Sequence, residues 1–280
     1  MMPHLGLITT RAGQVLLVLG ALLLLCRWFE WKSLYMPFRE LEGSPADLGL
    51  KYEDIQFVAE DGALLHGWWI PHAQARGTLL HCHGNAGNIS HRLDLAADLH
   101  RLQVNVFLFD YRGYGRSRGL PTEQGTYRDA RAAYEFVRAQ YGDQEQPPVI
   151  AHGQSLGGAV AVQLARDVPL RGLIVESCFS STLDMARLLY PWLPARWLCG
   201  FRYDARSKVG RLTLPKLFAH SPQDEMIPYA LGRELFAAAA EPKRFCALRG
   251  GHNEAGWQLS PEYWQEIEQF VQELFGPPSQ

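Results

Sequence analysis

The sequence lacks the patterns that would indicate a metal centre, a disulfide framework or a nucleic-acid-binding surface. Its five cysteines are scattered through 280 residues, with no C-x-x-C pair and no spacing typical of a zinc site. The 27 basic and 29 acidic residues give a formal net charge of −2, which provides no field to attract nucleic acid. No internal repeat or low-complexity segment is visible. We therefore expect one domain with a short appendage, acting on a small-molecule or lipid-like substrate.

Charged residues are also missing from residues 12–26, which are mostly leucine, valine, alanine and glycine. As a helix this run would be about 22 Å long, short of the roughly 30 Å hydrocarbon thickness of a bilayer. Arg11 and Arg27 flank the run and can extend their charges toward lipid headgroups. Aromatic rings suited to the membrane interface follow at once, namely Trp28, Phe29 and Trp31.

We expect residues 1–31 to anchor the protein in a membrane through a single helix. The alternatives are a cleaved signal peptide, a lipoprotein signal ending at Cys26 and a buried core helix. No small-x-small cleavage site follows the run, and Leu25 is bulky where a lipoprotein signal has a small residue. Basic residues are more frequent after the run than before it, which favours a cytoplasmic catalytic domain.

Beyond a connecting segment at 32–50, apolar runs typical of strands alternate with helical patterns. The eight strand-like runs are 54–59, 64–70, 78–83, 104–109, 149–152, 173–176, 216–220 and 244–248. A Glu-Asp-Gly turn separates the first two, which predicts an antiparallel hairpin. The strand-then-helix order of the rest predicts a mostly parallel eight-stranded sheet with helices on both faces, within a domain over 51–276.

One insertion, at about 178–212, is longer than a single crossover helix requires. It is rich in leucine and aromatic residues, and it follows a strand at the sheet edge where α/β proteins bind ligands. We expect a small cap whose side chains Leu189, Trp192 and Trp197 contact substrate. The alternative is that these side chains only pack the cap onto the body.

The sequence Gly-Gln-Ser-Leu-Gly at 153–157 has the G-x-S-x-G form, between a strand and a small-residue helix. A sharp strand-to-helix turn presents Ser155 at the top of the sheet, and the flanking glycines remove side chains that would clash. The serine also lies at a helix N-terminus, which favours developing negative charge. We therefore predict Ser155 as a nucleophile rather than as a helix cap in a glycine-rich turn.

A serine nucleophile needs a base, and the base needs a group that orients it. His252 follows the last strand in a glycine-containing loop, and Asp224 follows the strand before it. Both would project from the same edge of the sheet as Ser155. The chain order Ser, Asp, His is the one expected for an α/β hydrolase, so we predict these three residues as a catalytic triad.

The oxyanion of a reaction intermediate needs two backbone donors. The first is expected to be the N–H of Leu156, immediately after the nucleophile. The second should come from the loop after the strand that ends at His83, and we assign it to the N–H of Asn85, with Gly84 as the alternative.

Two further motifs carry weaker signals. His81 and His83 form an H-x-H pair, but no third ligand has a convincing spacing, so no metal site is predicted. The segment 110–117 is expected to be a structural turn, with Tyr111 as a candidate for lining the site.

Taken together, these motifs resemble the α/β-hydrolase superfamily over about residues 50–275. More narrowly, they are similar to the bud-emergence-type hydrolases, a group that includes membrane-associated depalmitoylases and many bacterial proteins. The motifs that carry the resemblance are 83–88, 110–115, 153–158, Asp224 and Gly251-His252. The resemblance implies hydrolysis of carboxylic esters or thioesters through an acyl-enzyme, without a cofactor. The N-terminus has one cysteine rather than a cluster suited to acylation, so we expect an anchored bacterial-type esterase rather than a protein depalmitoylase.

Two other functions remain open. A peptidase on the same fold would need a charged pocket to hold a peptide terminus, and the expected cap has no acidic cluster beyond Asp184 and Asp204. A catalytically silent scaffold would bind partners through the cap.

Overall fold

An eight-stranded sheet forms the centre of the protein, with strand order β10-β9-β8-β7-β4-β6-β3-β2. The strands are β2 (Glu53–Val58), β3 (Leu64–Ile70), β4 (Thr78–Cys82), β6 (Asn105–Asp110), β7 (Val149–Gln154), β8 (Gly172–Glu176), β9 (Lys216–His220) and β10 (Lys243–Ala247). Only β3 runs antiparallel to its neighbours in this sheet, as the second strand of a hairpin with β2. The prediction of a mostly parallel eight-stranded sheet is confirmed. The structure is a computed structural model and describes residues 3–254 and 256–278.

Strands β3 and β9 have the predicted bounds, and the ends of the other strands differ from the prediction by one or two residues. The largest difference is in β7, which continues past His152 to Gln154 because Gln154 pairs with Glu176 of the neighbouring β8. Strand β4 ends at Cys82, one residue earlier than predicted. Pairing between parallel strands decides these ends, and a single strand's sequence does not contain its partner's register.

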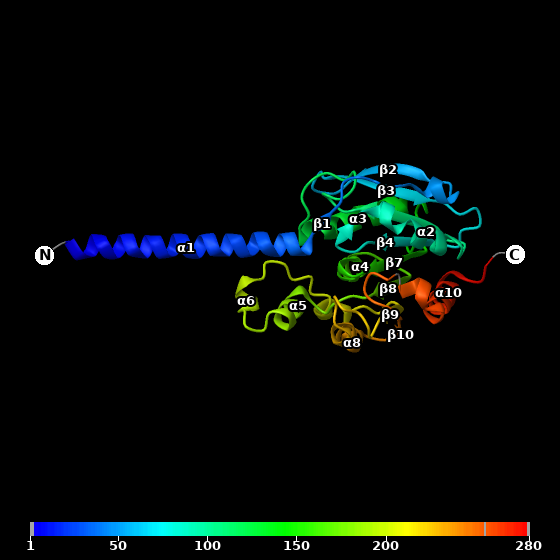
Figure 1. Cartoon of the computed structure of the whole chain (residues 1–280). Coiled ribbons are helices and arrows are strands. Elements are labelled where there is room, and N and C mark those ends of the chain that lie inside the picture. The colour runs from blue at the N-terminus through cyan, green and yellow to red at the C-terminus, as the bar shows by residue number, and fades with distance from the viewer. Residues whose placement is uncertain (1–2, 255, 279–280) are drawn as a thin grey trace.

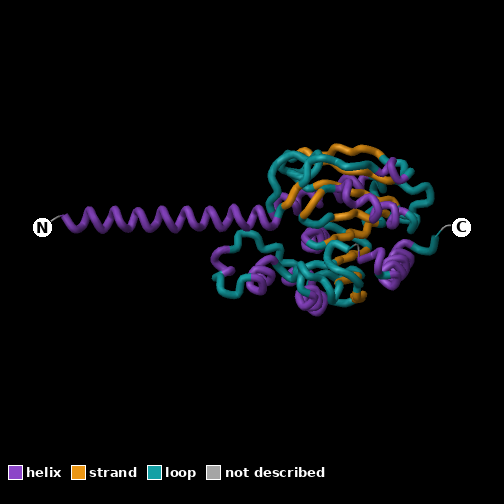
Figure 2. Tube along the Cα trace, in the orientation of Figure 1, coloured by secondary structure: helices purple, strands orange, loops and turns teal. Residues whose placement is uncertain are grey.

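Helices cover both faces of the sheet, as predicted (Figures 1 and 2). Helices α3 (Glu123–Ala139), α4 (Leu156–Asp167) and α8 (Tyr229–Ala238) contribute buried side chains to one apolar core. Helices α2 (Leu93–His100) and α10 (Pro261–Phe275) contribute to a second core on the opposite face. The remaining helical segments are α5 (Thr182–Leu189), α6 (Ala195–Leu198), α7 (Arg206–Val209), α9 (Gly256–Leu259) and the 3-10 turns η1 (Pro45–Leu48) and η2 (Ile89–Arg92).

Helix α1 (Pro3–Leu34) projects from the body as one continuous rod (Figure 1). Its segment Gly13–Leu34 has the length and composition to cross a membrane. The uncharged part of this segment lies away from the body, whereas Arg27, Glu30 and Trp31 near its end contact the body. Helix α1 extends beyond the uncharged run at 12–26, because the charged residues Arg27 and Glu30 are also helical.

The segment after α1 is more than a connection. Strand β1 (Met36–Pro37) pairs in parallel with β5 (Ala86–Gly87), which lies in the loop that follows β4. Further along, the side chain of Asn88 donates to the carbonyl oxygens of Phe38 and Glu40. The chain leaving α1 is therefore held against the loop at the carboxyl edge of the sheet.

Candidate active site

Ser155 lies in a sharp turn between β7 and α4, with φ 55° and ψ −121°. Such a positive φ is strained for a residue with a side chain and is typical of functional sites. The two flanking glycines make the turn possible. A Cβ on Gly153 would lie 2.3 Å from the carbonyl oxygen of Gly157, and one on Gly157 would lie 1.9 Å from that of Cys82.

A continuous chain of hydrogen bonds joins the three residues predicted as a triad. The ring atom Nδ1 of His252 lies 2.7 Å from Oδ2 of Asp224, and Nε2 lies 3.2 Å from Oγ of Ser155. A carboxylate at Nδ1 holds the proton there and leaves Nε2 able to accept a proton from serine. Asp224 has a fully buried side chain, while Ser155 keeps 7% of its surface exposed.

His252 is positioned by hydrogen bonds between two loops, the one that follows β9 and the one that follows β10. The hydroxyl of Ser221 donates to the carbonyl oxygen of Gly250 at 2.5 Å, and the N–H of Gly250 donates to the side chain of Gln223 at 2.9 Å. The backbone N–H of His252 donates to Glu225 at 3.0 Å. Glu225 therefore supports the backbone of the histidine, whereas Asp224 binds its ring.

The carboxylate of Asp224 accepts hydrogen bonds at both oxygens. Oδ1 accepts the N–H groups of Met226 and Ile227, at 3.0 Å and 2.7 Å. Oδ2 lies 3.3 Å from Nε2 of His220 in addition to its contact with His252. Burial favours a raised pKa for Asp224, but the hydrogen bonds from the two histidines outweigh it and hold this pKa below its ordinary value. Asp224 is therefore ionised at neutral pH.

His220 was not singled out in the sequence. It is the last residue of β9, fully inside the protein, and its Nε2 also donates to the carbonyl oxygen of Ile227 at 2.9 Å. The available signal was a histidine at the end of a predicted strand, four residues before Asp224. At that spacing, a side chain at the strand end can reach the carboxylate in the following turn.

The two predicted oxyanion donors lie in the places expected from the chain. Leu156 begins α4, directly after Ser155, and Asn85 follows β4. Within residues 3–254 and 256–278, neither N–H group donates to a backbone carbonyl. The carbonyl oxygen of Asn85 accepts the N–H of Met36 at 3.0 Å and the hydroxyl of Tyr114 at 2.8 Å, which fixes the loop. The alternative donor, Gly84, packs directly against Ser155.

A cleft of about 260 Å³ opens beside Ser155 and His252. Besides these two residues, Asn85, His91, Arg92, Gln154, Asn253 and Gln258 contribute to its walls. Arg92 was also missed in the sequence; its guanidinium donates to the carbonyl oxygen of Ala86 at 3.1 Å. The walls carry mainly polar groups, which suit the ester group and a polar part of a substrate.

The four predicted substrate contacts do not line this cleft. Tyr111 is fully buried, and its hydroxyl donates to the carbonyl oxygen of His83 at 3.1 Å. Leu189, Trp192 and Trp197 face solvent, with exposed fractions of 53%, 76% and 80%. The structure therefore does not bring these four side chains into the cleft. The ring of Tyr111 packs among the core aromatics, and Leu189, Trp192 and Trp197 lie at the surface of α5, α6 and the loop between them.

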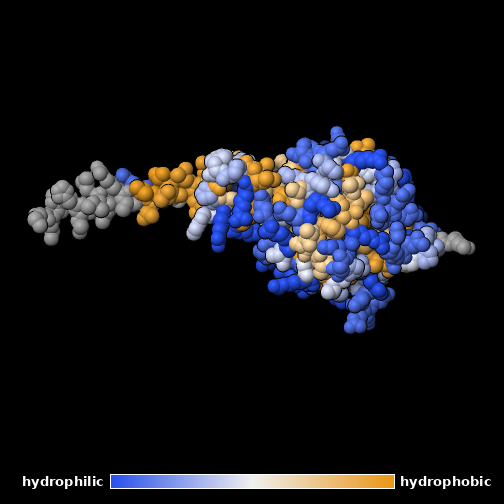
Figure 3. Space-filling view, turned by 90° about the horizontal axis from the view of Figure 1, so that it is seen from below, coloured by the Kyte–Doolittle hydropathy of each residue, from blue (hydrophilic) through white to orange (hydrophobic). Residues whose placement is uncertain are grey.

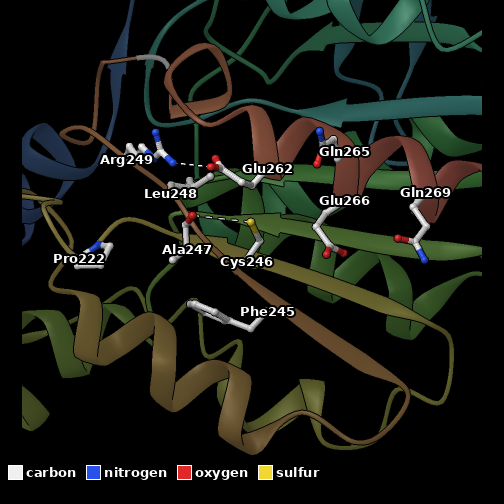
Figure 4. A pocket seen from close by; sticks show the side chains of 10 residues that line it. All are labelled: Pro222, Phe245, Cys246, Ala247, Leu248, Arg249, Glu262, Gln265, Glu266 and Gln269. Atoms are coloured by element: carbon white, nitrogen blue, oxygen red, sulfur yellow. Dashed lines mark hydrogen bonds and ion pairs between the residues drawn. The ribbon is translucent and has the colours of Figure 1, made fainter.

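A larger hollow of about 550 Å³ lies elsewhere, between the edge strand β10 and helix α10 (Figure 4). Arg249 and Glu262 form an ion pair across it, and Cys246 lies at its base. Burial raises the pKa of the Cys246 thiol to about 11, so this sulfur is protonated at neutral pH. Cys246 is therefore not an activated nucleophile.

The two histidines of the H-x-H pair take different partners. Nδ1 of His81 lies 3.2 Å from Nδ1 of His152, whereas Nδ1 of His83 donates to the carbonyl oxygen of Gly84 at 2.7 Å. Burial holds the pKa of both rings below its ordinary value. Across the described part of the chain, no group of three or more His, Cys, Asp or Glu side chains is arranged to hold a metal ion.

Comparison with known proteins agrees with this architecture. A family described as serine aminopeptidase S33 matches residues 73–200. The alpha/beta hydrolase domain-containing protein WAV2 of Arabidopsis thaliana is 34% identical over 286 residues, covering 92% of this chain and 91% of its own. Protein bem46 of Schizosaccharomyces pombe is 31% identical over 247 residues, covering 84% of this chain and 81% of its own.

Among solved structures, an esterase of Pyrococcus furiosus superposes with a TM-score of 0.71 at 19% identity, covering 87% of this chain and 98% of its own. That likeness shows the fold, and the relatives with more than 30% identity show the family. The chain belongs to the α/β-hydrolase superfamily, in the group that includes bem46.

Proposed function

We propose that this protein is a serine hydrolase that cleaves carboxylic esters or thioesters through an acyl-enzyme. The observation that carries the proposal is the hydrogen-bonded series from Asp224 through His252 to Ser155, with Ser155 held at a positive φ. These residues come from three separate loops, and a purely structural role would not require a serine in a strained turn. The chain's membership of the α/β hydrolases supports the same chemistry.

In the proposed mechanism, Nε2 of His252 accepts the proton of Ser155 as Oγ attacks the carbonyl carbon. Asp224 stabilises the imidazolium that forms and keeps the ring in the required tautomer. His252 then returns the proton to the alcohol or thiol leaving group. In the second half of the reaction, water attacks the acyl-enzyme, His252 accepts a proton from that water, and Oγ of Ser155 leaves with its proton restored.

The N–H groups of Leu156 and Asn85 would bind the negative oxygen of each tetrahedral intermediate. Leu156 is at the N-terminus of α4, where the helix dipole adds to the stabilisation. Removing one such donor in other serine hydrolases costs about 10²- to 10³-fold in kcat. The contacts that fix the Asn85 loop are therefore part of the proposed machinery.

An aminopeptidase is the second candidate, because the matching family is described as a serine aminopeptidase. The cleft wall includes one carboxylate, Asp94, which could bind a peptide amino group, but Arg92 lies in the same wall. A paired charge of opposite sign weakens recognition of a cationic terminus. Comparison of p-nitrophenyl esters with aminoacyl p-nitroanilides separates the two activities.

We also propose that α1 anchors the protein in a membrane. The support is the apolar segment Gly13–Leu34, which has the length and composition to cross a membrane and whose uncharged part projects from the body. A cleaved signal sequence is the competing interpretation, and the N-terminal sequence of the mature protein distinguishes them. The excess of basic residues after the apolar run favours an orientation with the catalytic domain in the cytoplasm.

A fluorophosphonate probe tests the proposed activity. Wild-type protein should be labelled and should lose ester hydrolysis as it is labelled, whereas Ser155→Ala should show neither labelling nor hydrolysis. Circular dichroism of the variant checks that it is folded. Labelling of Ser155→Ala equal to that of wild type would refute the proposal, and absence of labelling in both would favour a binding scaffold.

A further inference from the structure

Five exposed apolar side chains gather on α5, α6 and the loop between them. We call this the cap surface, and it consists of Leu188, Leu189, Tyr190, Trp192 and Trp197. Trp192 and Trp197 are 76% and 80% exposed, although tryptophan is among the most costly residues to leave in water. A patch of this kind on an otherwise polar surface indicates a partner.

The cap surface is held beside α1 by direct contacts. Nη1 of Arg27 donates to the carbonyl oxygen of Leu198 at 2.6 Å, at the end of α6. The carboxylate of Glu30 accepts the N–H groups of Gly200 and Phe201, at 2.8 Å and 3.1 Å. Figure 1 shows α5 and α6 on the same side of the body as α1.

These contacts fix the position of the cap surface along the axis of α1. Arg27 is the first charged residue after the uncharged run, so it marks the place where α1 would leave the hydrocarbon. In Figure 3, apolar side chains of α1 (orange) extend toward the body, until paler and more hydrophilic side chains cover the helix. Because Arg27 binds Leu198, the neighbouring Trp197 would lie at the boundary between hydrocarbon and headgroups if α1 crosses a bilayer.

We propose that the cap surface rests in the headgroup layer of the bilayer that α1 crosses, and that its partner is the lipid surface itself. The inference rests on the proposed membrane anchor. Tryptophan and tyrosine are the side chains that prefer this layer, since their rings are apolar and their N–H or O–H groups remain hydrated. Arg187 and Arg196 are exposed among them and suit lipid phosphates.

One consequence concerns the cleft. Strand β1 joins the end of α1 to β5, and Asn85 and Ala86 line the cleft, so one wall of the cleft lies close to the end of α1. With the cap surface on the bilayer, Ser155 would be held at a fixed, short distance from esters or thioesters exposed at the lipid surface. The substrate class that this favours is an acyl ester carried by the membrane.

Fluorescence of a site-specific label in the full chain, inserted in phosphatidylcholine vesicles, tests the proposal. Cys26 and Cys199 are first changed to serine, because the other three cysteines are buried. Single cysteines are then introduced by Trp192→Cys and Trp197→Cys in the cap surface, by Leu24→Cys in α1, and by Ala73→Cys. Ala73 is exposed in the loop before β4, at the opposite edge of the sheet, and is the matched control.

Each cysteine is labelled with a polarity-sensitive nitrobenzoxadiazole dye, and hydrolysis of a soluble ester checks that each variant is folded.

We expect the labels at 192 and 197 to shift to shorter emission wavelength on insertion and to be quenched best by spin-labelled lipid with the quencher at the headgroup. The label at 24 should be quenched best by a quencher within the acyl chain, and the label at 73 by neither. If the cap labels behave like the label at 73 while the label at 24 is quenched, the cap proposal is wrong and the anchor proposal stands. If the label at 24 is also unquenched, both fail, while the esterase proposal remains separate. A shift of the labels at 192 and 197 to shorter wavelength without quenching by spin-labelled lipid would mean that they are buried in protein. That result would also overturn the inference.

Discussion

The backbone N–H of Met36 donates a hydrogen bond to the carbonyl oxygen of Asn85, 3.0 Å away. This bond joins the segment that leaves α1 to the loop from which an oxyanion donor is expected. The pairing of β1 with β5 continues the same connection. The N-terminal region has the composition of a membrane-spanning helix, and its end is also attached to the candidate active site.

Two truncations test the role of this connection. Deleting residues 1–26 should leave kcat on a soluble ester unchanged, because Arg27, Glu30 and β1 remain. Deleting residues 1–40 removes β1 and should lower kcat by about tenfold to a hundredfold, since misplacing a positioned donor by about 1 Å can cost 10²-fold. Both proteins are compared at equal concentration of folded protein. Equal kcat values for the two truncations would show that β1 does not support the Asn85 loop.

The turn after β6 provides a test of stability. Arg112 binds Asp61 through two hydrogen bonds, at 2.8 Å and 3.0 Å, and binds the buried carboxylate of Asp129 at 2.8 Å. Arg112→Ala would leave Asp129 buried without its cationic partner, so we expect the free energy of unfolding to fall by about 3–5 kcal/mol. Arg116→Ala, which removes an exposed ion pair with Asp54, should cost less than about 1 kcal/mol. Urea denaturation measures both, and equal losses would contradict the structural role of Arg112.

Hydrolysis should be lost at acid pH because His252 alone is protonated, while Asp224 stays ionised. Hydrogen bonds from His220 and His252 hold the pKa of Asp224 below its ordinary value of about 4, so Asp224 stays ionised as the pH falls from 8 to 5. Its contribution to stability is likewise complete above that ordinary value and is lost only as the pH falls through the lowered pKa. Protonation of His252 removes the base, so log(kcat/KM) should fall with a slope of one per pH unit. A slope of two over this range would mean that Asp224 also takes up a proton.

Substitutions of the neighbouring residues Asp224 and Glu225 test which carboxylate orients the ring of His252. Asp224→Asn should lower kcat by about 10⁴-fold, because an amide favours the wrong tautomer of His252. Glu225→Gln keeps an oxygen that accepts the backbone N–H of His252, so its loss should be less than about tenfold, or about 1.4 kcal/mol. A larger loss for Glu225→Gln than for Asp224→Asn would reverse the two roles.

Much of the fold could be predicted because local patterns and global architecture agree. The run at 104–109 is almost wholly apolar, as a parallel strand covered on both faces must be, and the G-x-S-x-G motif fixes where the strand-to-helix turn lies. Ser155, Asp224 and His252 could be predicted as neighbours because each follows a strand, and parallel strands end at one edge of the sheet.

Other features depend on contacts that no single segment encodes. His220 approaches Asp224 only because the turn after β9 folds back on the strand end. Tyr111 could be placed near the site from the sequence, but its burial depends on the rings packed around it. The outward orientation of Trp192 and Trp197 follows from short helices whose positions are set by Arg27 and Glu30, more than 150 residues earlier in the chain.

The central claim is that Ser155 carries the acyl group, and rapid mixing with a p-nitrophenyl ester tests it most directly. If deacylation is the slower step, p-nitrophenol should appear in a burst of one equivalent per protein molecule. Mass spectrometry of the acid-quenched protein should then find the acyl mass on the peptide that contains Ser155. The variant Ser155→Ala should give neither the burst nor the added mass. An acyl group found on another residue, or a full burst from Ser155→Ala, would contradict the account.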